Sequence, residues 1–117
     1  PVVKIKQTSQ DIGRTSLEVK QLVSQAWKIQ NQRYSSHQFQ FNSELESYQI
    51  KQFIELPSAC YQLLERAVNK LKLSTRAYFQ VIRVARTIAD LEQSKTIKPC
   101  YVQEALGFTV EKNFRSN

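Results

Sequence analysis

Hydrophobic and polar residues follow one another along this chain with the period of an α-helix. In residues 57–73, apolar side chains recur every three or four positions and form one face. Residues 74–91 carry a wider apolar arc, about half of the helix circumference, which is typical of a central helix. Sustained alternation and hairpin dipeptides are missing after the first few residues. The sequence therefore predicts an all-α fold, a compact bundle of four or five helices joined by short turns.

Local signals predict where these helices begin and end. Capping boxes, in which a side chain and a backbone amide satisfy each other, are expected at Thr15–Glu18 and Ser43–Glu46. Residues 34–42 lack periodicity and are expected to form a loop. The third, fourth and fifth helices should begin near Pro57, Ser74 and Pro99, since proline suits a first helical turn and serine caps one. We expect the fourth helix to end near Leu91 and the fifth to stop at Gly107.

Three segments follow from this division of the chain. Residues 1–14 should form a flexible arm, residues 15–109 the helical domain and residues 110–117 a frayed tail. The chain opens on Pro1 without a methionine, which we interpret as a cut inside a longer protein. The apolar faces predict a core built from Leu22, Val23, Trp27, Phe53, Leu63, Leu64, Val68, Val81, Ile82, Ala85, Ile88, Val102 and Leu106.

Composition narrows the classes of partner. The net charge of +7 favours anionic partners such as nucleic acid, although the charge is spread along the chain, so a diffusely basic surface remains an alternative. No apolar run approaches the roughly 20 residues that span a bilayer, so no membrane partner is predicted. Cys60 and Cys100 are the only cysteines, and two isolated thiols suggest a reducing compartment and therefore a cytoplasmic protein. We expect both thiols to be buried and reduced, and a disulfide between them is the alternative. With His37 as the only histidine, no metal site is predicted.

The fourth helix carries a polar stripe opposite its apolar arc. The stripe consists of Arg76, Gln80, Arg83, Thr87 and Asp90, and Arg86 lies on its flank. One interpretation is a solvated face with weak ion pairs. The other concerns Arg76, which lies in the first turn, where the helix dipole disfavours a cation unless an anion is close. Its planar guanidinium could hold phosphate oxygens there.

Residues 73–92, LSTRAYFQVIRVARTIADLE, are similar to the signature LSxRAYxRILxVARTIADLEG of the magnesium-chelatase-like (competence protein M) family of AAA+ ATPases. The resemblance extends to the opening Pro1-Val2-Val3, to Gly13-Arg14, Gln30 to Arg33 and Asn42, and to Ile97 through Leu106, and so covers nearly residues 1–109. The chain departs from the family where Phe79 and Gln80 replace histidine and arginine, and where Cys100-Tyr101 replaces Glu-His. It also departs at Thr109, where the family commonly has arginine.

This resemblance implies a C-terminal lid domain that covers the nucleotide of an AAA+ core. Arg76 matches the sensor-2 arginine, which acts on the γ-phosphate, and Ser74 is a second candidate nucleotide contact. ATP and Mg²⁺ would be cofactors of the parent protein only. The two glycines of this chain cannot build a phosphate loop, so the chain by itself is not expected to be an enzyme. The implied partners are the AAA+ core, neighbouring subunits of a ring and DNA, with the parent protein acting in DNA processing or uptake.

A stand-alone basic helical module that binds DNA, or an adaptor, is the alternative. Such a module would use Arg83, Arg86, Lys95 and Lys98 on phosphates and would need no ATPase partner. The same four residues are candidates for an interface in the lid interpretation. No recognition helix with a helix-turn-helix turn is evident, which favours the lid.

Overall fold

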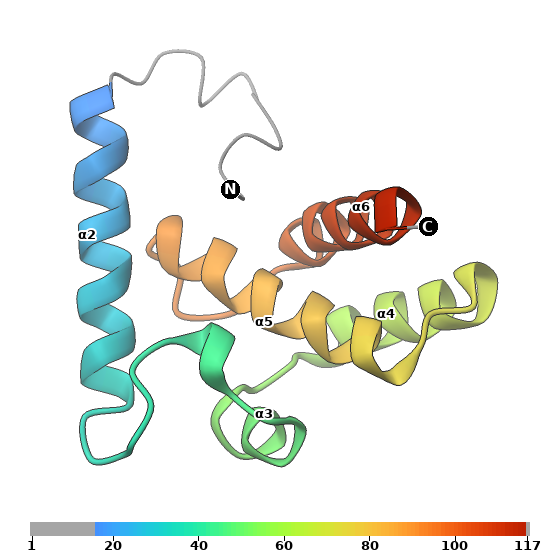
Figure 1. Cartoon of the computed structure of the whole chain (residues 1–117), viewed down its shortest axis with the longest axis horizontal. Coiled ribbons are helices and arrows are strands. Elements are labelled where there is room, and N and C mark those ends of the chain that lie inside the picture. Colours follow the sequence, from blue (N-terminus) through green and yellow to red (C-terminus); the bar gives the residue numbers. More distant parts are fainter. Residues whose placement is uncertain (1–15, 117) are drawn as a thin grey trace.

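The computed structural model describes residues 16–116, with side chains as far as Val110. Within this range the chain forms five α-helices and a 3₁₀ turn, without a strand, which confirms the predicted all-α fold (Figure 1). The predicted arm over residues 1–14 lies outside the described residues. The elements are α2 (Ser16–Arg33), η2 (Asn42–Glu44), α3 (Ser47–Phe53), α4 (Ser58–Leu71), α5 (Thr75–Leu91) and α6 (Pro99–Ser116).

Helix α5 is the centre of the bundle, as its wide apolar arc predicts. It contacts α2, η2, α3 and α6, while α4 packs against α6 (Figure 1). More than half of the residues of α5 are buried, including Val81, Ala85 and Ala89, which are fully enclosed. Leu64 of α4 and Val102 of α6 complete the same core. The 3.6-residue period of each helix thus places one continuous apolar stripe against its neighbours.

Helix α2 stands at the edge of the bundle, beside the C-terminal end of α5 (Figure 1). Only Ala26 and Gln30 of its eighteen residues are buried. Trp27 was predicted in the core, but its side chain is 55% exposed and meets the ring of Phe41 edge-on. That prediction is wrong because α2 packs against the bundle through a narrow strip that contains Ala26 and Gln30, and Trp27, the residue after Ala26, faces away from it. Leu22 and Val23 are half-buried for the same reason.

The caps of the helices follow the sequence in part. Ser74 caps α5, since its Oγ accepts the Ala77 amide at 3.1 Å, as predicted. The capping box expected at residues 43–46 lies further on: Glu46 caps α3, and its amide donates to Gln49 Oε1 at 2.8 Å. The stop predicted at Gly107 is wrong, because α6 continues to Ser116 and the backbone of the supposed tail is helical. A glycine inside a helix costs only about 1 kcal/mol, which packing against α4 and α5 offsets.

The two cysteines differ in their surroundings. Cys60 is fully buried between α4 and α6, and its Sγ donates to the Ile97 carbonyl at 3.3 Å, so its predicted burial is confirmed. Burial, with a smaller effect of Cys100, raises the pKa of the Cys60 thiol. Cys100 was also predicted to be buried, but it is exposed in the first turn of α6. Both thiols are free in the structure.

Candidate functional site

The polar stripe of α5 changes in character along the helix. Arg76 at its start is exposed, Gln80, Arg83 and Thr87 are half-buried, and Asp90 at its end is 1% exposed. The stripe as a whole is therefore not the solvated face that one interpretation predicted. Helix α2 and the segment after it cover the C-terminal half of the stripe. The covering residues are distant in sequence, since Asn42, for example, bonds to Thr87 across 45 positions.

Asp90 holds two arginines from different helices. Arg33 of α2 makes a bidentate pair with its carboxylate, at 2.8 Å to Oδ1 and 3.1 Å to Oδ2. Arg86, one turn earlier on α5, donates to Oδ1 from Nη2 at 3.0 Å and from Nε at 3.3 Å. One carboxylate thus serves two guanidinium groups, and the cluster keeps a net positive charge. Burial lowers the pKa of Arg33, but the hydrogen bonds and charge of Asp90 outweigh it and raise the pKa above its ordinary value.

Asn42 completes this network from the loop between α2 and α3. Its Nδ2 donates to Asp90 Oδ2 at 2.9 Å and to Thr87 Oγ1 at 3.2 Å. Its Oδ1 accepts from the Tyr34 hydroxyl at 2.6 Å and from Arg33 Nη1 at 3.2 Å. The backbone N–H of Asn42 donates to Gln30 Oε1 at 3.0 Å. A fully buried side chain with all its polar atoms bonded joins α2, η2 and α5 into one rigid unit.

Arg86 was predicted to contact nucleic acid or a partner, and this needs correction. Its side chain is buried, and besides its bonds to Asp90 it donates from Nη2 to the Ser94 carbonyl at 2.9 Å and from Nη1 to the Lys95 carbonyl at 3.1 Å. These bonds close the turn after α5. Arg86 therefore acts as a structural cation, because a buried guanidinium that donates four hydrogen bonds to protein acceptors offers little to an outside anion.

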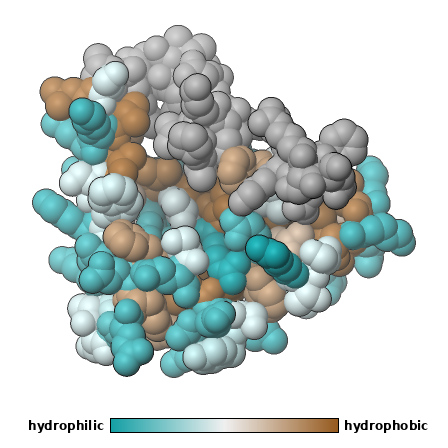
Figure 2. Space-filling view, viewed as in Figure 1, coloured by the Kyte–Doolittle hydropathy of each residue, from teal (hydrophilic) through white to brown (hydrophobic). Residues whose placement is uncertain are grey.

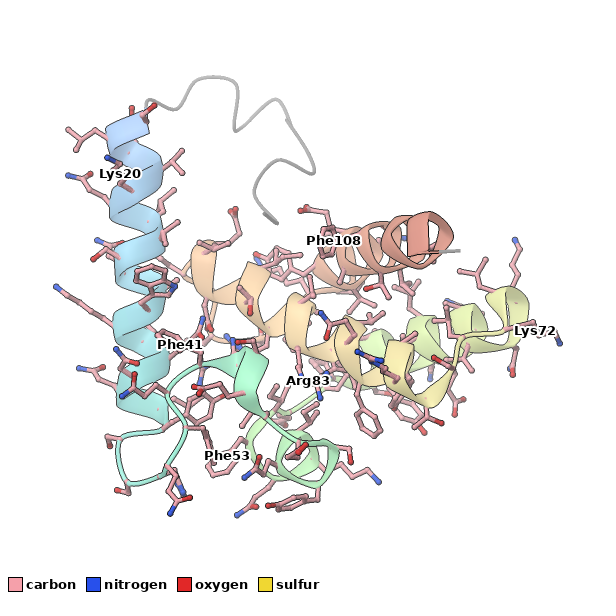
Figure 3. All side chains as sticks on the ribbon, in the orientation of Figure 1. Lys20, Phe41, Phe53, Lys72, Arg83 and Phe108 are labelled. Atoms are coloured by element: carbon pink, nitrogen blue, oxygen red, sulfur yellow. The ribbon has the colours of Figure 1, made fainter. Side chains whose placement is uncertain are left out.

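The other three candidate contacts differ in how far they face solvent. Arg83 is half-buried and lies on the side of α5 that faces η2 and α3 (Figure 3). Its Nε donates to the Leu45 carbonyl at 2.8 Å and its Nη1 to Gln80 Oε1 at 3.2 Å, so it too is largely occupied. Lys95 and Lys98 are both exposed. Of the four basic residues that a stand-alone DNA-binding module would use, only Lys95 and Lys98 thus face solvent.

Arg76 and Ser74 lie at the opposite end of α5, next to the corner marked by Lys72 (Figure 3). Among the residues that the structure describes, Arg76 has no hydrogen-bond or ion-pair partner, and its side chain is exposed. About 21 Å separates its position from that of Asp90, at 1.5 Å per helical residue. A cavity of about 490 Å³ lies beside the helix start, lined by Ser74, Thr75 and mainly apolar residues, but Arg76 is not part of its lining.

The described part of the chain offers little to other ligand classes. Residues 16–110 contain no group of three histidine, cysteine or acidic side chains that could hold a metal ion. None of the described helices is both long and apolar enough to cross a bilayer. What remains is one unpaired arginine at a helix start and a buried polar network at the other end of the same helix.

Sequence reasoning identified Arg76 but missed the network. Arg86, Thr87 and Asp90 were visible as polar positions, while their partners Arg33 and Asn42 lie in segments for which no role was predicted. The one available signal was that Gln30 to Arg33 and Asn42 belong to the quoted family resemblance. The structure gives three of those positions a common role, since Gln30, Arg33 and Asn42 meet in the network around Asp90.

Comparison with known proteins identifies relatives of this chain. The chain is 37% identical over 102 residues to competence protein ComM of Haemophilus influenzae, which covers 87% of this chain and 19% of that protein. It is 38% identical over 96 residues to the uncharacterized protein YifB of Escherichia coli, which covers 82% of this chain and 18% of that protein. The chain thus spans less than a fifth of the length of these relatives. No solved structure matches it significantly.

A family model gives the assignment. The model described as magnesium chelatase, subunit ChlI C-terminal, matches residues 13–109. This range contains the whole of α2 to α5, and with them Arg76 and the complete network around Asp90. The chain therefore belongs to the magnesium-chelatase-like family, as the C-terminal helical domain of such a protein.

Proposed function

We propose that this chain is the lid of an AAA+ ATPase, which covers the nucleotide and places Arg76 as a sensor-2 arginine against the γ-phosphate. The single observation that carries the proposal is the state of Arg76. It is exposed in the first turn of the central helix of a family domain and has no acceptor among the described residues. ATP and Mg²⁺ would bind to the AAA+ core of the parent protein.

A comparison among the arginines supports this role. Arg33, Arg83 and Arg86 are all held by protein acceptors. Within residues 16–110 only Arg66 and Arg76 are exposed without a partner, and Arg66 lies in the middle of α4. The first turn of a helix carries a partial positive charge and therefore disfavours an arginine by a few tenths of a kcal/mol. An approaching phosphate reverses that penalty, because it is attracted both by the helix start and by the guanidinium.

The buried network supports the same proposal in a second way. A sensor arginine has to be held at a defined place relative to the nucleotide, since misplaced charges stabilise a transition state poorly. Asp90, Arg33 and Asn42 join α5 to α2 and η2 and so make α5 a rigid carrier. Ser74, whose Oγ caps the first turn, orders the backbone directly next to Arg76.

Hydrolysis by the full-length protein tests the proposal. The Arg76→Ala variant should bind ATP but hydrolyse it much more slowly, because the arginine is needed where charge develops during phosphoryl transfer. Equal rates at saturating ATP would contradict the sensor role. The 117-residue chain by itself should show no ATP hydrolysis and no submillimolar ATP affinity, since one arginine offers only a weak, screened contact.

We further propose that α2 contributes to ring assembly. No residue of its first ten is buried, and Leu17 and Trp27 are 65% and 55% exposed. Figure 2 shows apolar side chains gathered on the surface at this end of the molecule. Exposed apolar groups of this kind favour an intersubunit contact. Light scattering on the full-length protein with Leu17→Glu would test this, and an unchanged particle mass would contradict it.

For the parent protein we propose a role in DNA processing. The support is the relationship to a protein named competence protein ComM, together with the family resemblance of residues 73–92. A basic chain with a net charge of +7 also suits work beside an anionic polymer. Loss of DNA uptake or recombination in cells that lack the full-length protein would be the direct test, and normal uptake would contradict the proposal.

A further inference from the structure

A basic hollow of about 680 Å³ lies between α2 and the turn that follows α5. Lys28 and Arg33 line it from α2, and Arg86 and Lys95 line it from the other side. Asp90 is the only carboxylate in the lining. The hollow is therefore a concentration of positive charge on a surface whose charge is otherwise spread out.

The charge in the hollow is only partly neutralised by the protein. Asp90 balances one of the two arginines that bind it, so one positive charge remains at the floor. On the rim, Lys28 and Lys95 are exposed, and neither side chain has a partner among the described residues. Arg33 is 21% exposed and keeps its Nε–H without a described acceptor.

The cations at the floor are held before any ligand arrives. Arg33 and Arg86 are fixed by hydrogen bonds to Asp90, to Asn42 and to the carbonyl of Lys95. The two sides of the hollow are also tied together, because Gln93 Nε2 donates to Gln25 Oε1. The two arginines at the floor therefore need no ordering when an anion enters, so only the lysines on the rim lose side-chain entropy on binding.

The rest of the lining favours a phosphate backbone over a protein surface. Gln25, Gln32, Gln93 and Ser94 supply amide and hydroxyl groups, and with lysine and arginine these are the side chains that contact nucleic-acid phosphates. Ile29 is the only apolar residue of the lining. A protein partner would instead need an apolar or aromatic centre, where lysine is depleted.

We infer that this hollow binds the phosphodiester backbone of DNA, with Lys28 and Lys95 as its two direct phosphate contacts and Arg33 as a fixed charge beneath them. The inference rests on the proposed DNA-processing function only in the choice of DNA as the nucleic acid. It is independent of Arg76, which lies at the other end of α5. Recognition by backbone charge implies binding without base-sequence preference and with a steep dependence on salt.

The test is fluorescence anisotropy of a labelled 20-base-pair duplex titrated with the 117-residue chain between about 50 and 200 mM salt, the range over which phosphate contacts lose most of their affinity. The double variant Lys28→Ala/Lys95→Ala should weaken binding about tenfold at the lowest salt and reduce the salt slope by about two. The control double variant Lys51→Ala/Lys70→Ala removes two exposed lysines that do not line the hollow, and should change the slope little. Circular dichroism should show all variants to be folded.

Three results would overturn the inference. The first is an equal loss in both double variants, which would mean diffuse attraction to the whole surface. The second is unchanged binding in the Lys28/Lys95 variant. The third is tighter binding of polyglutamate than of DNA through the same two lysines, which would make the hollow a site for an acidic protein. This test measures DNA binding and not ATP hydrolysis, so a negative result leaves the role proposed for Arg76 unaffected. In the same way, a negative result for the Arg76 variants leaves this DNA site unaffected.

Discussion

The side-chain amide of Asn42 donates to the carboxylate of Asp90 at 2.9 Å, across 48 positions of sequence. The carboxylate already accepts from Arg33 and Arg86, so the amide completes its set of donors. This contact joins the loop after α2 to the last turn of α5 inside the protein. Buried polar groups of this kind are expensive when left unpaired and orient their elements when fully paired.

Asp90→Asn should reduce the free energy of unfolding by about 3–5 kcal/mol, because it leaves two buried or half-buried guanidinium groups without their counter-ion. Urea unfolding followed by circular dichroism measures the change. Glu55→Gln, at an exposed position in the segment between α3 and α4, is the control and should stay within about 0.5 kcal/mol of wild type. A similarly small loss in both variants would mean that the network contributes little to stability.

Arg76→Ala should leave unfolding within about 0.5 kcal/mol of wild type, since the side chain is exposed and unpaired in the described structure. ATP hydrolysis by the full-length protein should nevertheless fall by roughly 10²-fold or more. Arg76→Lys should restore little, because an ammonium cannot reproduce the planar, bidentate guanidinium.

The control for Arg76 is Arg66→Ala, which removes the other exposed and unpaired arginine of the described chain. Arg83 is unsuitable for this purpose because its hydrogen bond to the Leu45 carbonyl gives it a structural role. Arg66→Ala should hydrolyse ATP at the wild-type rate. Comparable loss in both variants, or unfolding of Arg76→Ala, would remove the basis for a sensor arginine at this position.

Leu64→Ala and Trp27→Ala should separate core from surface. Leu64 is fully buried, and its truncation should cost about 2–5 kcal/mol of unfolding free energy. Trp27 is the larger side chain, but it is mostly exposed, so its replacement should cost about 1 kcal/mol or less. Denaturant titration of the two variants decides this, and a larger loss for Trp27 would place that indole in the core after all.

The two thiols should differ sharply in reactivity. Cys100 is exposed and should react with a thiol reagent near pH 8 within minutes in the native protein, whereas Cys60 should react only after unfolding. Burial protects the Cys60 sulfur and raises its pKa, which lowers its thiolate fraction. Titration with a chromogenic disulfide should therefore count one thiol in buffer and two in denaturant. Two fast thiols in buffer would contradict the packing between α4 and α6.

Stability should fall in mildly alkaline solution. Burial raises the pKa of Cys60 and of Tyr34, so the folded chain keeps protons that the unfolded chain loses. The stability that these groups contribute is complete below their unfolded values, about 8.5 for a thiol and 10 for a phenol, and is lost as the pH rises through the folded values. Unfolding midpoints between pH 7 and 11 test this. Cys60→Ala should be less stable at neutral pH but show a flatter curve above pH 8.5, and a curve as steep as that of wild type would exclude Cys60 as a cause.

The sequence by itself determined the all-α class of the fold and where several of the helices begin. Ser74 caps α5 and Pro99 opens α6 as predicted, because a cap is satisfied within three or four residues of chain. The faces of α4 and α5 were equally predictable, since a strong 3.6-residue period leaves only one way to bury them. Arg76 could be identified for the same reason: its first-turn position is a local property.

Only the tertiary structure decided which polar positions are covered. Asp90 and Arg76 belong to the same polar stripe, yet one is enclosed and the other exposed, because α2 and η2 reach only one end of α5. Trp27 and Cys100 were misplaced for the converse reason, since nothing near them in sequence reveals that no helix covers them. Burial depends on contacts between residues far apart in the chain, and those contacts are made only when the helices pack.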